Sequence, residues 1–365
     1  MAEENADEPM AGGDVKAAAK ARAATLIGKT IRGKYRIEEL AAMGGLAAVF
    51  RATRLAGEQE VAIKILHPEA EGLPELIERF EREAIAGKHI LHRNVVAVHE
   101  IDQLDDGSYF LVQDYVRGRT LRDLIDEGPV TPIRAARIAR QVAAGLLAAH
   151  DMGIVHRDLK PLNIMMGDGP DELVQIVDFG LAKVPVDDLS VLEQRRSLTQ
   201  AGVLFGTVAY MAPEAALGMR NVDKRSDLYA LGVVLYELLA GKHPFTATAP
   251  AALFAQQRNE IPPKIAARSP GVAVPPVLEA VVERLLEKDP DARYPNARAL
   301  MVALDGAILE METTAKPAPE AGGPPLALPR KGLVGAAIGV AALVAVVISV
   351  SRDEVIRRPR RDLGA

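Results

Sequence analysis

The chain has 365 residues, 49% of them apolar, which is enough for one large or two ordinary domains with a sizeable core. Its formal net charge of −5 at pH 7 gives no indication of nucleic-acid binding. It contains no cysteine, so disulfides and thiolate zinc sites are excluded, which fits a reducing compartment.

The N-terminal segment, residues 1–34, is expected to be a disordered tail. Residues 1–8 are acidic and lack the apolar run of a secretory signal peptide. The alanine-rich stretch 11–24 could form a transient helix, but a solvated tail is the simpler interpretation.

A first strand is predicted at 35–40, and a segment rich in small residues follows it. Residues 41–49 read Ala-Ala-Met-Gly-Gly-Leu-Ala-Ala-Val. Glycine is needed where a backbone approaches a phosphate closely or adopts a positive φ angle. With only Gly44 and Gly45, this segment alone is too weak a signal to assign.

Residues 60–66, Glu-Val-Ala-Ile-Lys-Ile-Leu, have the pattern of a strand. At period two, Ala62 and Lys64 share one face, opposite the larger apolar side chains. A small residue and a lysine on one face suit a bound nucleotide. The alternative, a surface lysine on an edge strand, would be favoured for an isolated Lys64.

A helix is predicted within 74–91, because its apolar residues have helical spacing. These residues are Leu76, Ile77, Phe80 and Ala84. Gly87 lies one turn after Glu83. A glycine inside a helix costs about 1 kcal/mol relative to alanine, so this helix is expected to be soft.

Two more strands are predicted at 95–100 and 109–112, on either side of a polar turn. The chain continues through Gln113-Asp114-Tyr115-Val116. Further on, Thr131-Pro132 predicts a helix start, with proline at the first helical position. The apolar stripe of this helix is typical of a core rather than of a ligand site: Ile133, Ile138, Val142, Leu146 and Leu147.

The chemistry is concentrated in residues 154–165, Ile-Val-His-Arg-Asp-Leu-Lys-Pro-Leu-Asn-Ile-Met. This loop places Asp158, Lys160 and Asn163 between apolar runs. Asp178-Phe179-Gly180 follows the apolar run 173–177. Phosphoryl transfer from ATP needs a carboxylate to take the acceptor proton and oxygen ligands for Mg²⁺, and these two strings supply both.

Together these motifs resemble the catalytic core of the protein-kinase superfamily. The lysine two residues after Asp158 is the pattern of serine/threonine kinases rather than tyrosine kinases. The chain is similar to the bacterial Hanks-type group, and the resemblance covers about 35–309. It implies an α+β, bilobal protein-kinase-like fold. The small lobe (35–113) would hold a five-stranded antiparallel sheet and a helix, and the larger lobe (117–309) would be mostly helical.

The resemblance assigns a role to each polar residue of the loop. Asp158 would orient and deprotonate the acceptor hydroxyl, and Lys160 would neutralise the γ-phosphate during transfer. Asn163 and Asp178 would hold Mg²⁺, with Mn²⁺ as an alternative, through oxygen atoms. Arg157 is expected to receive a phosphate of the activation segment through charge-assisted hydrogen bonds.

The same resemblance predicts an ATP site between the lobes. Lys64 would contact the α- and β-phosphates and pair with Glu83, while Ala62 would pack against the adenine. The other expected contacts come from the phosphate-covering hairpin, the hinge and the floor of the pocket: Ala41, Ala42, Met43, Gly44, Gly45, Val49, Gln113, Asp114, Val116 and Met165. Gln113 would guard the back of the pocket, or it is an ordinary polar strand residue.

The phosphate-covering hairpin departs from the family pattern. The three glycines of the pattern fall at Ala42, Gly44 and Ala47, so only the middle one is present. Alanine adds only one methyl group to glycine, which is the smallest side chain that could obstruct the phosphates. The departure therefore predicts weaker ATP binding rather than its loss.

The activation segment would run from Asp178 to Glu214, and its end resembles the substrate-side anchor of serine/threonine kinases. The candidate phosphosites are Ser197, Thr199 and Thr207. Ordinary loop polarity is the alternative for the first two. Thr207 would hydrogen-bond to Asp158 and Lys160, with a phosphosite as its alternative. Ser197 and Thr199 are therefore the better phosphosite candidates.

Two long-range contacts are expected in the large lobe. Glu214 should pair with Arg293. Asp227 should cap the helix that begins near it and brace the backbone of the catalytic loop.

The C-terminal part divides into a proline-rich linker (310–331), an uncharged segment (332–350) and a short basic tail (351–365). The uncharged segment would be about 29 Å long as a helix, close to the roughly 30 Å of a bilayer core. We expect a single transmembrane helix in the inner membrane, with the kinase domain in the cytoplasm where ATP and Mg²⁺ are found. A buried helix is the alternative, and the side of the tail stays open.

The expected function is a membrane-associated serine/threonine protein kinase with ATP and protein substrates as partners. Activation-loop autophosphorylation and a kinase-domain dimer belong to this hypothesis, and no nucleic acid does. One alternative is a pseudokinase scaffold, supported by the altered glycine pattern and Gly87. The other is a small-molecule phosphotransferase, against which the anchor at 206–214 argues.

Overall fold

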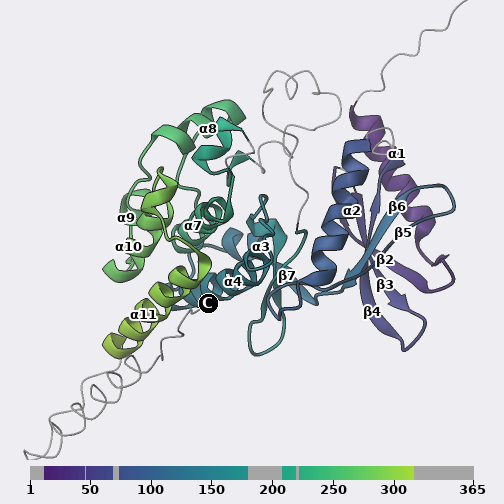
Figure 1. Cartoon of the computed structure of the whole chain (residues 1–365), viewed down its shortest axis with the longest axis horizontal. Coiled ribbons are helices and arrows are strands. Elements are labelled where there is room, and N and C mark those ends of the chain that lie inside the picture. The colour runs from purple at the N-terminus through teal and green to yellow at the C-terminus, as the bar shows by residue number, and fades with distance from the viewer. Residues whose placement is uncertain (1–11, 46, 69–73, 180–207, 219–221, 316–365) are drawn as a thin grey trace, which may run out of the picture. The chain divides into compact units, whose positions relative to one another are not determined.

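The computed structural model describes residues 12–45, 47–68, 74–179, 208–218 and 222–315 (Figure 1). The described chain is mainly β-structure up to Asp114 and mainly helical from Leu121 onward. The two lobes predicted from the sequence are therefore present.

The first lobe is built on an antiparallel sheet with the strand order β1-β2-β3-β4-β6-β5. Its strands are β1 (Thr30–Ile31), β2 (Tyr35–Met43), β3 (Ala47–Arg54), β4 (Gln59–Leu66), β5 (Val98–Gln103) and β6 (Tyr109–Asp114). Four of them, β2, β4, β5 and β6, overlap the strands predicted by range, and β3 makes up the five-stranded sheet that the resemblance implies. The sixth, β1, pairs with the start of β2 and lies in the segment expected to be a tail.

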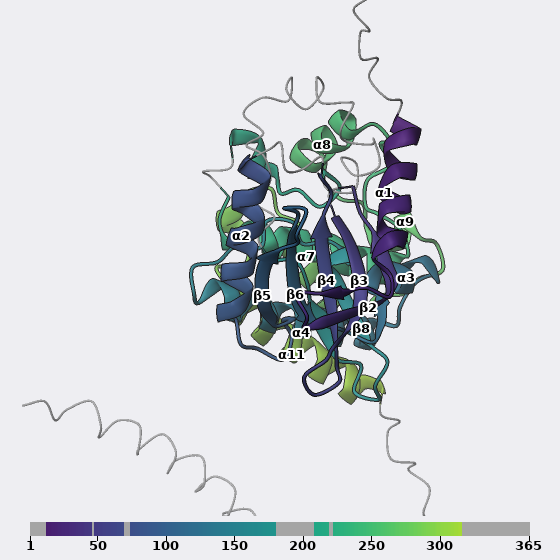
Figure 2. The same ribbon diagram turned by 90° about the vertical axis from the view of Figure 1, so that its right-hand side faces the viewer.

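The two faces of this sheet carry different helices (Figure 2). One face contributes the buried side chains of Phe50, Ile63 and Ile65, and α1 (Gly12–Leu26) packs against their cluster. The other face contributes Leu66 and Leu111, which cluster with buried residues of α2 (Pro74–His89). Because successive side chains of a strand point to opposite faces, the two apolar clusters lie on opposite sides of the sheet.

Helix α1 corrects the expectation of a disordered tail. Ala23 is only 3% exposed in the cluster of the sheet, and Leu26 packs beside it. Arg22 donates to Asp106 Oδ2 (2.6 Å) and Ser108 Oγ (2.7 Å) in the β5–β6 turn. Alanine has a high helix propensity, and these tertiary contacts supply what a short isolated helix lacks. These contacts could not be predicted from the sequence, because α1 has no broad apolar stripe.

Gly87 has a packing role that the sequence did not show. Helix α2 continues through it to His89. A Cβ at this position would lie 2.3 Å from Val98 Cγ2 and 3.0 Å from Val98 Cβ. Glycine thus lets α2 approach β5 closely, while the expected softness of the helix stays a prediction.

The second lobe is organised around α7 (Lys224–Ala240), which is buried on nearly every side. The other α-helices in the described part of this lobe are α3 (Leu121–Asp126), α4 (Pro132–His150), α8 (Pro250–Asn259), α9 (Ile265–Arg268), α10 (Pro276–Leu285) and α11 (Ala297–Ala315). Helices α3, α4, α9 and α10 pack against α7, and α11 packs on α4 and α10. A helix that is apolar all round has to be enclosed by others. A small antiparallel sheet completes the lobe, with β7 (Gly118–Thr120), β8 (Ile164–Gly167) and β9 (Val174–Ile176).

The end of the lobe lies further along the chain than predicted. Helix α11 runs to Ala315, beyond the expected domain end at Leu309. Met311 is 8% exposed, and Glu312 pairs with Arg137 of α4 at 2.7 Å. The start of the predicted linker is therefore helical.

The predicted membrane segment, 332–350, lies outside the described residues. In the part of the chain that the structure describes, no helix combines the length and the apolar character needed to cross a bilayer.

Candidate active site

The catalytic loop follows α4 and is shaped by one buried carboxylate. Asp227 of α7, 1% exposed, accepts hydrogen bonds from the backbone amides of His156 and Arg157, each at 2.8 Å. His150 Nε2 lies 2.8 Å from the same carboxylate. The predicted brace is thus confirmed. The predicted cap is wrong, because Asp223 caps α7 and Asp227 lies inside its first turn.

Three polar side chains of the loop form one hydrogen-bonded group. Lys160 Nζ lies 2.7 Å from Asp158 Oδ2. Asn163 Nδ2 donates to the Asp158 carbonyl at 2.9 Å and is 3.3 Å from Asp158 Oδ2. Asn163 belongs to the short 3-10 helix η2 (Pro161–Asn163), which leads directly into β8. The loop therefore presents a carboxylate beside a cation and an amide.

Asp178 is brought to this group by β9. The amide of Val177 donates to the carbonyl of Asn163 at 3.0 Å, and His156 Nε2 lies 3.2 Å from the Val177 carbonyl. The His156 ring is fully buried and packs edge-on against Phe179, with centroids 4.7 Å apart. His156 is thus a packed, hydrogen-bonded residue of the loop.

Two residues of the site have left-handed backbone angles, with φ of +64° at Arg157 and +59° at Asp178. Such angles are uncommon outside glycine, and they cluster at functional sites where the surroundings fix them. Here Asp227 holds the amide of Arg157, and the Asn163–Val177 bond holds the residue before Asp178.

Lys64 joins the sheet to this loop. Its Nζ lies 2.9 Å from Asp178 Oδ1, and its side chain is 6% exposed. Lys64 sits on β4, opposite Val49 of β3 and Leu111 of β6. The side chain of Glu83, the partner predicted for Lys64, lies outside the described part of the structure.

The register of the sheet places further predicted nucleotide contacts on the face that carries Lys64. Directly opposite residues of antiparallel strands share a face. Val49 is opposite Lys64, and Gln113 is opposite Ala62. Ala62 and Gln113 are 5% and 7% exposed. This face therefore joins a small residue, an amide and a cation, and both interpretations of Gln113 stay open.

The hairpin and the hinge flank that face. Ala41, Ala42 and Met43 end β2, and the amide of Gly44 donates to the carbonyl of Ala47 at 2.9 Å. Gly45 follows in the turn.

At the hinge, the amide of Asp114 donates to the Ala97 carbonyl at 3.0 Å. Any backbone contact of Asp114 with an adenine must therefore come from its carbonyl. Val116 lies two residues further on, before β7, and Met165 lies on β8 opposite Thr120.

The residues present suit a magnesium ion bound together with a nucleotide. Mg²⁺ prefers oxygen ligands and is usually held by one or two carboxylates plus substrate phosphates. Asp178 supplies a carboxylate, and the Asn163 amide nitrogen faces Asp158, so its amide oxygen is left for other partners. Within the described ranges, no group of three His, Cys, Asp or Glu residues could hold a metal alone.

The substrate-side anchor contains a buried ion pair. The two terminal guanidinium nitrogens of Arg293 each lie 2.8 Å from the Glu214 carboxylate, and the Arg293 side chain is fully buried. Ser226 Oγ donates to the same carboxylate at 2.5 Å. Burial acts to raise the pKa of Glu214, but the hydrogen bonds and charge of Arg293 outweigh it, so this pKa is lowered. The predicted pair is confirmed.

The anchor has further supports that sequence reasoning missed. The carbonyl of Ala209 accepts hydrogen bonds from His243 Nε2 (2.9 Å) and from the buried Gln257. Tyr210 donates to Glu237 Oε2 at 2.6 Å. Burial, and then the Glu237 carboxylate, raise the pKa of Tyr210 well above its ordinary value. His243 and Gln257 lie far along the chain in no recognisable motif, so no sequence signal indicated them.

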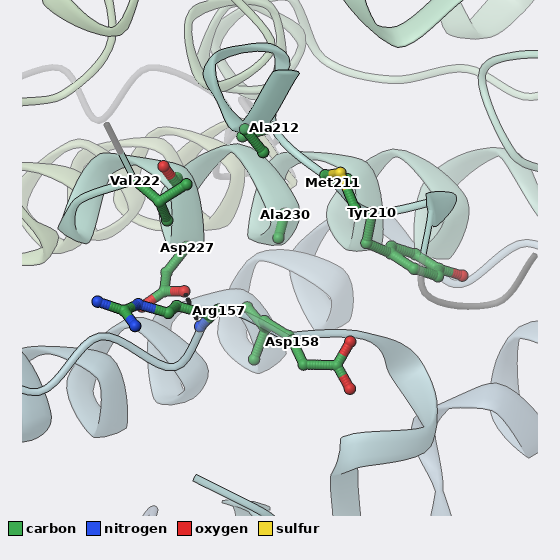
Figure 3. A pocket seen from close by; sticks show the side chains of 11 residues that line it. Arg157, Asp158, Tyr210, Met211, Ala212, Val222, Asp227 and Ala230 are labelled. Carbon is green, nitrogen blue, oxygen red and sulfur yellow. Dashed lines mark hydrogen bonds between the residues drawn. The ribbon is translucent and has the colours of Figure 1, made fainter. Parts of the chain in front are cut away.

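A hollow lies between the anchor and the catalytic loop (Figure 3). Its lining includes Leu159 of the loop, Met211 of the anchor and Ala230 of α7. In Figure 3 the Asp158 carboxylate and the Arg157 guanidinium point in different directions, with the Arg157 amide bonded to Asp227. Ser197, Thr199 and Thr207 lie outside the described residues.

Comparison with known proteins places this fold and site in a family. The protein kinase domain family matches residues 35–302. The chain belongs to this family. It is 37% identical over 281 residues to the serine/threonine-protein kinase pkn3 of Myxococcus xanthus. It is 36% identical over 275 residues to the serine/threonine-protein kinase PknB of Mycobacterium tuberculosis.

These relatives are longer than this chain. The matches cover 76% and 74% of this chain but only 50% and 42% of pkn3 and PknB, so the chain spans about half the length of the curated relatives it matches.

Solved structures share the fold. The crystal structure of the Mycobacterium tuberculosis PknI kinase domain has a TM-score of 0.57 at 26% identity, covering 76% of this chain and 97% of that one. Rad53 in complex with AMP-PNP has a TM-score of 0.60 at 26% identity, covering 75% of this chain and 66% of that one.

Proposed function

We propose that this chain is a serine/threonine protein kinase that transfers the γ-phosphate of ATP to hydroxyl groups of protein substrates. The observation that carries the proposal is one connected set of side chains. Lys64 pairs with Asp178, the amide of the preceding residue Val177 donates to Asn163, and Asn163 is bonded to Asp158. A phosphate clamp, two oxygen ligands and a proton acceptor thus lie together, as phosphoryl transfer requires.

In this scheme Asp158 orients the acceptor hydroxyl and takes its proton. Lys160, 2.7 Å from Asp158, adds positive charge where the transferred phosphoryl group carries negative charge. Lys64 holds the phosphates of ATP. Asn163 and Asp178 would hold Mg²⁺, which when bound neutralises phosphate charge.

Two features support a protein as the phosphate acceptor. The anchor around Glu214 is rigidly tied to the helical lobe, as a surface that binds a polypeptide needs to be. The hollow beside Asp158 has mostly apolar walls and would suit a small side chain next to the acceptor residue.

The direct test is transfer of labelled phosphate from ATP to the protein itself and to casein. Asp158→Asn should lower the rate by about 10²- to 10⁴-fold, the usual contribution of a general base. Asp151→Asn is a matched control, because Asp151 is exposed and only loosely paired with Arg298. Equal labelling of the wild type and Asp158→Asn would contradict the proposal and favour a scaffold.

Autophosphorylation of the activation segment is part of the proposal. The exposed side chain of Arg157, next to Asp158, is placed to receive a phosphate through charge-assisted hydrogen bonds. Ser197, Thr199 and Thr207 are the proposed acceptors. Mass spectrometry of wild type and Asp158→Asn should find phosphate on this segment only in the wild type. Phosphate in both would point to another kinase.

We also propose that residues 332–350 anchor the kinase in the inner membrane, with its catalytic domain in the cytoplasm. The support is the uncharged length of this segment. The full chain should be recovered with membranes and released by detergent, whereas a chain ending at Lys331 should be soluble. An equal distribution of both chains would contradict the anchor.

A further inference from the structure

The hairpin between β2 and β3 is held on both of its arms. On the β3 arm, Ala47 pairs with Leu66 of β4. On the β2 arm, the carbonyl oxygen of Gly44 lies 3.0 Å from Nε2 of His67, the residue directly after β4. The end of one strand thus contacts both sides of the turn.

The chemistry of this contact fixes its direction. A carbonyl oxygen can only accept, so Nε2 of His67 must carry the hydrogen and donate it. The His67 residue is 7% exposed, so water competes little for the bond. The bond therefore limits the rotation of the peptide group that follows Gly44, in the turn proposed to cover the ATP phosphates.

Helix α1 encloses the same histidine. His67 lines a hollow together with Arg22 and Ala23 of α1 and with Ala48 and Ile65 of the sheet. Arg22 reaches the carbonyl of Leu66 at 3.5 Å, one residue before His67, besides its two bonds to the β5–β6 turn. The helix is thus attached to the sheet where the support of the hairpin begins.

We propose that His67 is a positioning residue of the nucleotide-covering hairpin, and that α1 supports it by enclosing His67. This inference rests on the proposed function, because the hairpin covers ATP phosphates only if the chain is a kinase. A turn already held near its bound conformation loses less freedom when a ligand binds, so affinity rises. Such a support has particular value here, because Ala42 and Ala47 replace glycines of the family pattern.

The histidine is tested with two replacements in the full chain. His67→Leu keeps volume but removes the donor, and His67→Gln keeps a donor. We expect His67→Leu to weaken binding of magnesium AMP-PNP about three- to tenfold, the range of one hydrogen bond. Amide exchange across residues 42–50 should become faster, and His67→Gln should lie closer to the wild type.

His89→Leu is the control, because His89 is exposed and its hydrogen bond among the described residues is to the carbonyl of Ile85, within α2. If His67→Leu binds the nucleotide and exchanges its hairpin amides like the wild type, the positioning role is overturned.

The helix is tested separately with Arg22→Ala, compared with Lys20→Ala at an exposed position of α1. Arg22→Ala should weaken nucleotide binding about two- to threefold and speed exchange in the hairpin, whereas Lys20→Ala should do neither. If Arg22→Ala speeds exchange within 12–26 but leaves the hairpin unchanged, α1 is not a support.

These measurements do not depend on phosphate transfer. A wild type that binds AMP-PNP but transfers nothing would remove the proposed function, while the effect of His67→Leu on binding would still decide the inference. In an active enzyme, the variant should raise KM for ATP and leave kcat nearly unchanged.

Discussion

The anchor on the helical lobe and the hairpin on the β-lobe are held by different means. The anchor depends on buried charge, with Glu214 bonded to Arg293 and Ser226 and only 8% of its side chain exposed. The hairpin depends on strand pairing and on the hydrogen bond from the buried His67 to the carbonyl of Gly44. Breaking a buried ion pair leaves an uncompensated buried charge, whereas losing a single hydrogen bond to a carbonyl costs only about 0.5–1.5 kcal/mol. A firmly held anchor suits a surface that binds a polypeptide, and a more easily opened hairpin suits a cover that must let the nucleotide in and out.

The largest expected effect is on the anchor. Arg293→Met should lower the free energy of unfolding by about 3–5 kcal/mol, because it leaves the Glu214 carboxylate buried without its partner. Thermal or urea denaturation measures this change. Arg298→Met is the matched control, since Arg298 lies 3.7 Å from Asp151 with 70% of its side chain exposed. A loss no greater than that of the control would remove the contrast between the two regions.

Acid should act on the same pair. The pKa of Glu214 is lowered from its ordinary value of 4.5, so the pair contributes stability above that pH. This contribution is lost as the pH falls through the lowered pKa of the folded state. Unfolding measured between pH 3 and 6 should therefore show a loss below 4.5 that is smaller in Glu214→Gln. Parallel profiles would contradict the assignment.

An intermediate loss of stability is expected from removing one tyrosine hydroxyl, and each lobe offers one such tyrosine. Tyr210 donates to Glu237 (2.6 Å) and Tyr35 donates to Glu100 (2.7 Å). The Glu237 side chain is 4% exposed and that of Glu100 is 25% exposed. Because water can replace the lost hydroxyl more easily at Glu100, Tyr210→Phe should cost about 1–3 kcal/mol and Tyr35→Phe less. Equal costs would show that the β-lobe is bonded as firmly as the anchor.

The smallest effect concerns the two alanines of the hairpin. Ala42 is exposed and lies opposite Val49, whereas Ala47 is 6% exposed and packs in the cluster of Leu66 and Phe80. Ala42→Gly should tighten ATP binding about twofold through closer approach of the backbone. Ala47→Gly should instead cost about 0.5–1 kcal/mol of stability. Titration with ATP and thermal denaturation of both variants would show whether the positions differ. Tightening by both would support the simpler view that each alanine only obstructs the phosphate.

Most of the candidate site could be predicted because its functional residues lie in short sequence motifs. Asp158, Lys160 and Asn163 lie close in sequence, and the pairing of Glu214 with Arg293 followed from the family pattern. The supports of those motifs could not be predicted. His67 and Gln257 act through single hydrogen bonds to carbonyls 23 and 48 residues away, which depend on tertiary register rather than on residue type.

The fold shows the same division. Period-two alternation predicted β4, and the apolar stripe predicted α4. Helix α1 was missed because small alanines and one arginine attach it, which leaves no broad apolar face to recognise.

Because α2 approaches β5 closely at Gly87, even the methyl group of an alanine at this position would force the helix and the strand apart. Valine is stiff at χ1, so Val98 cannot easily turn away from an added Cβ. Any side chain there would push the helix outward, and Glu83 would travel with it. A substitution at position 87 would therefore shift α2 without changing any residue assigned to the reaction.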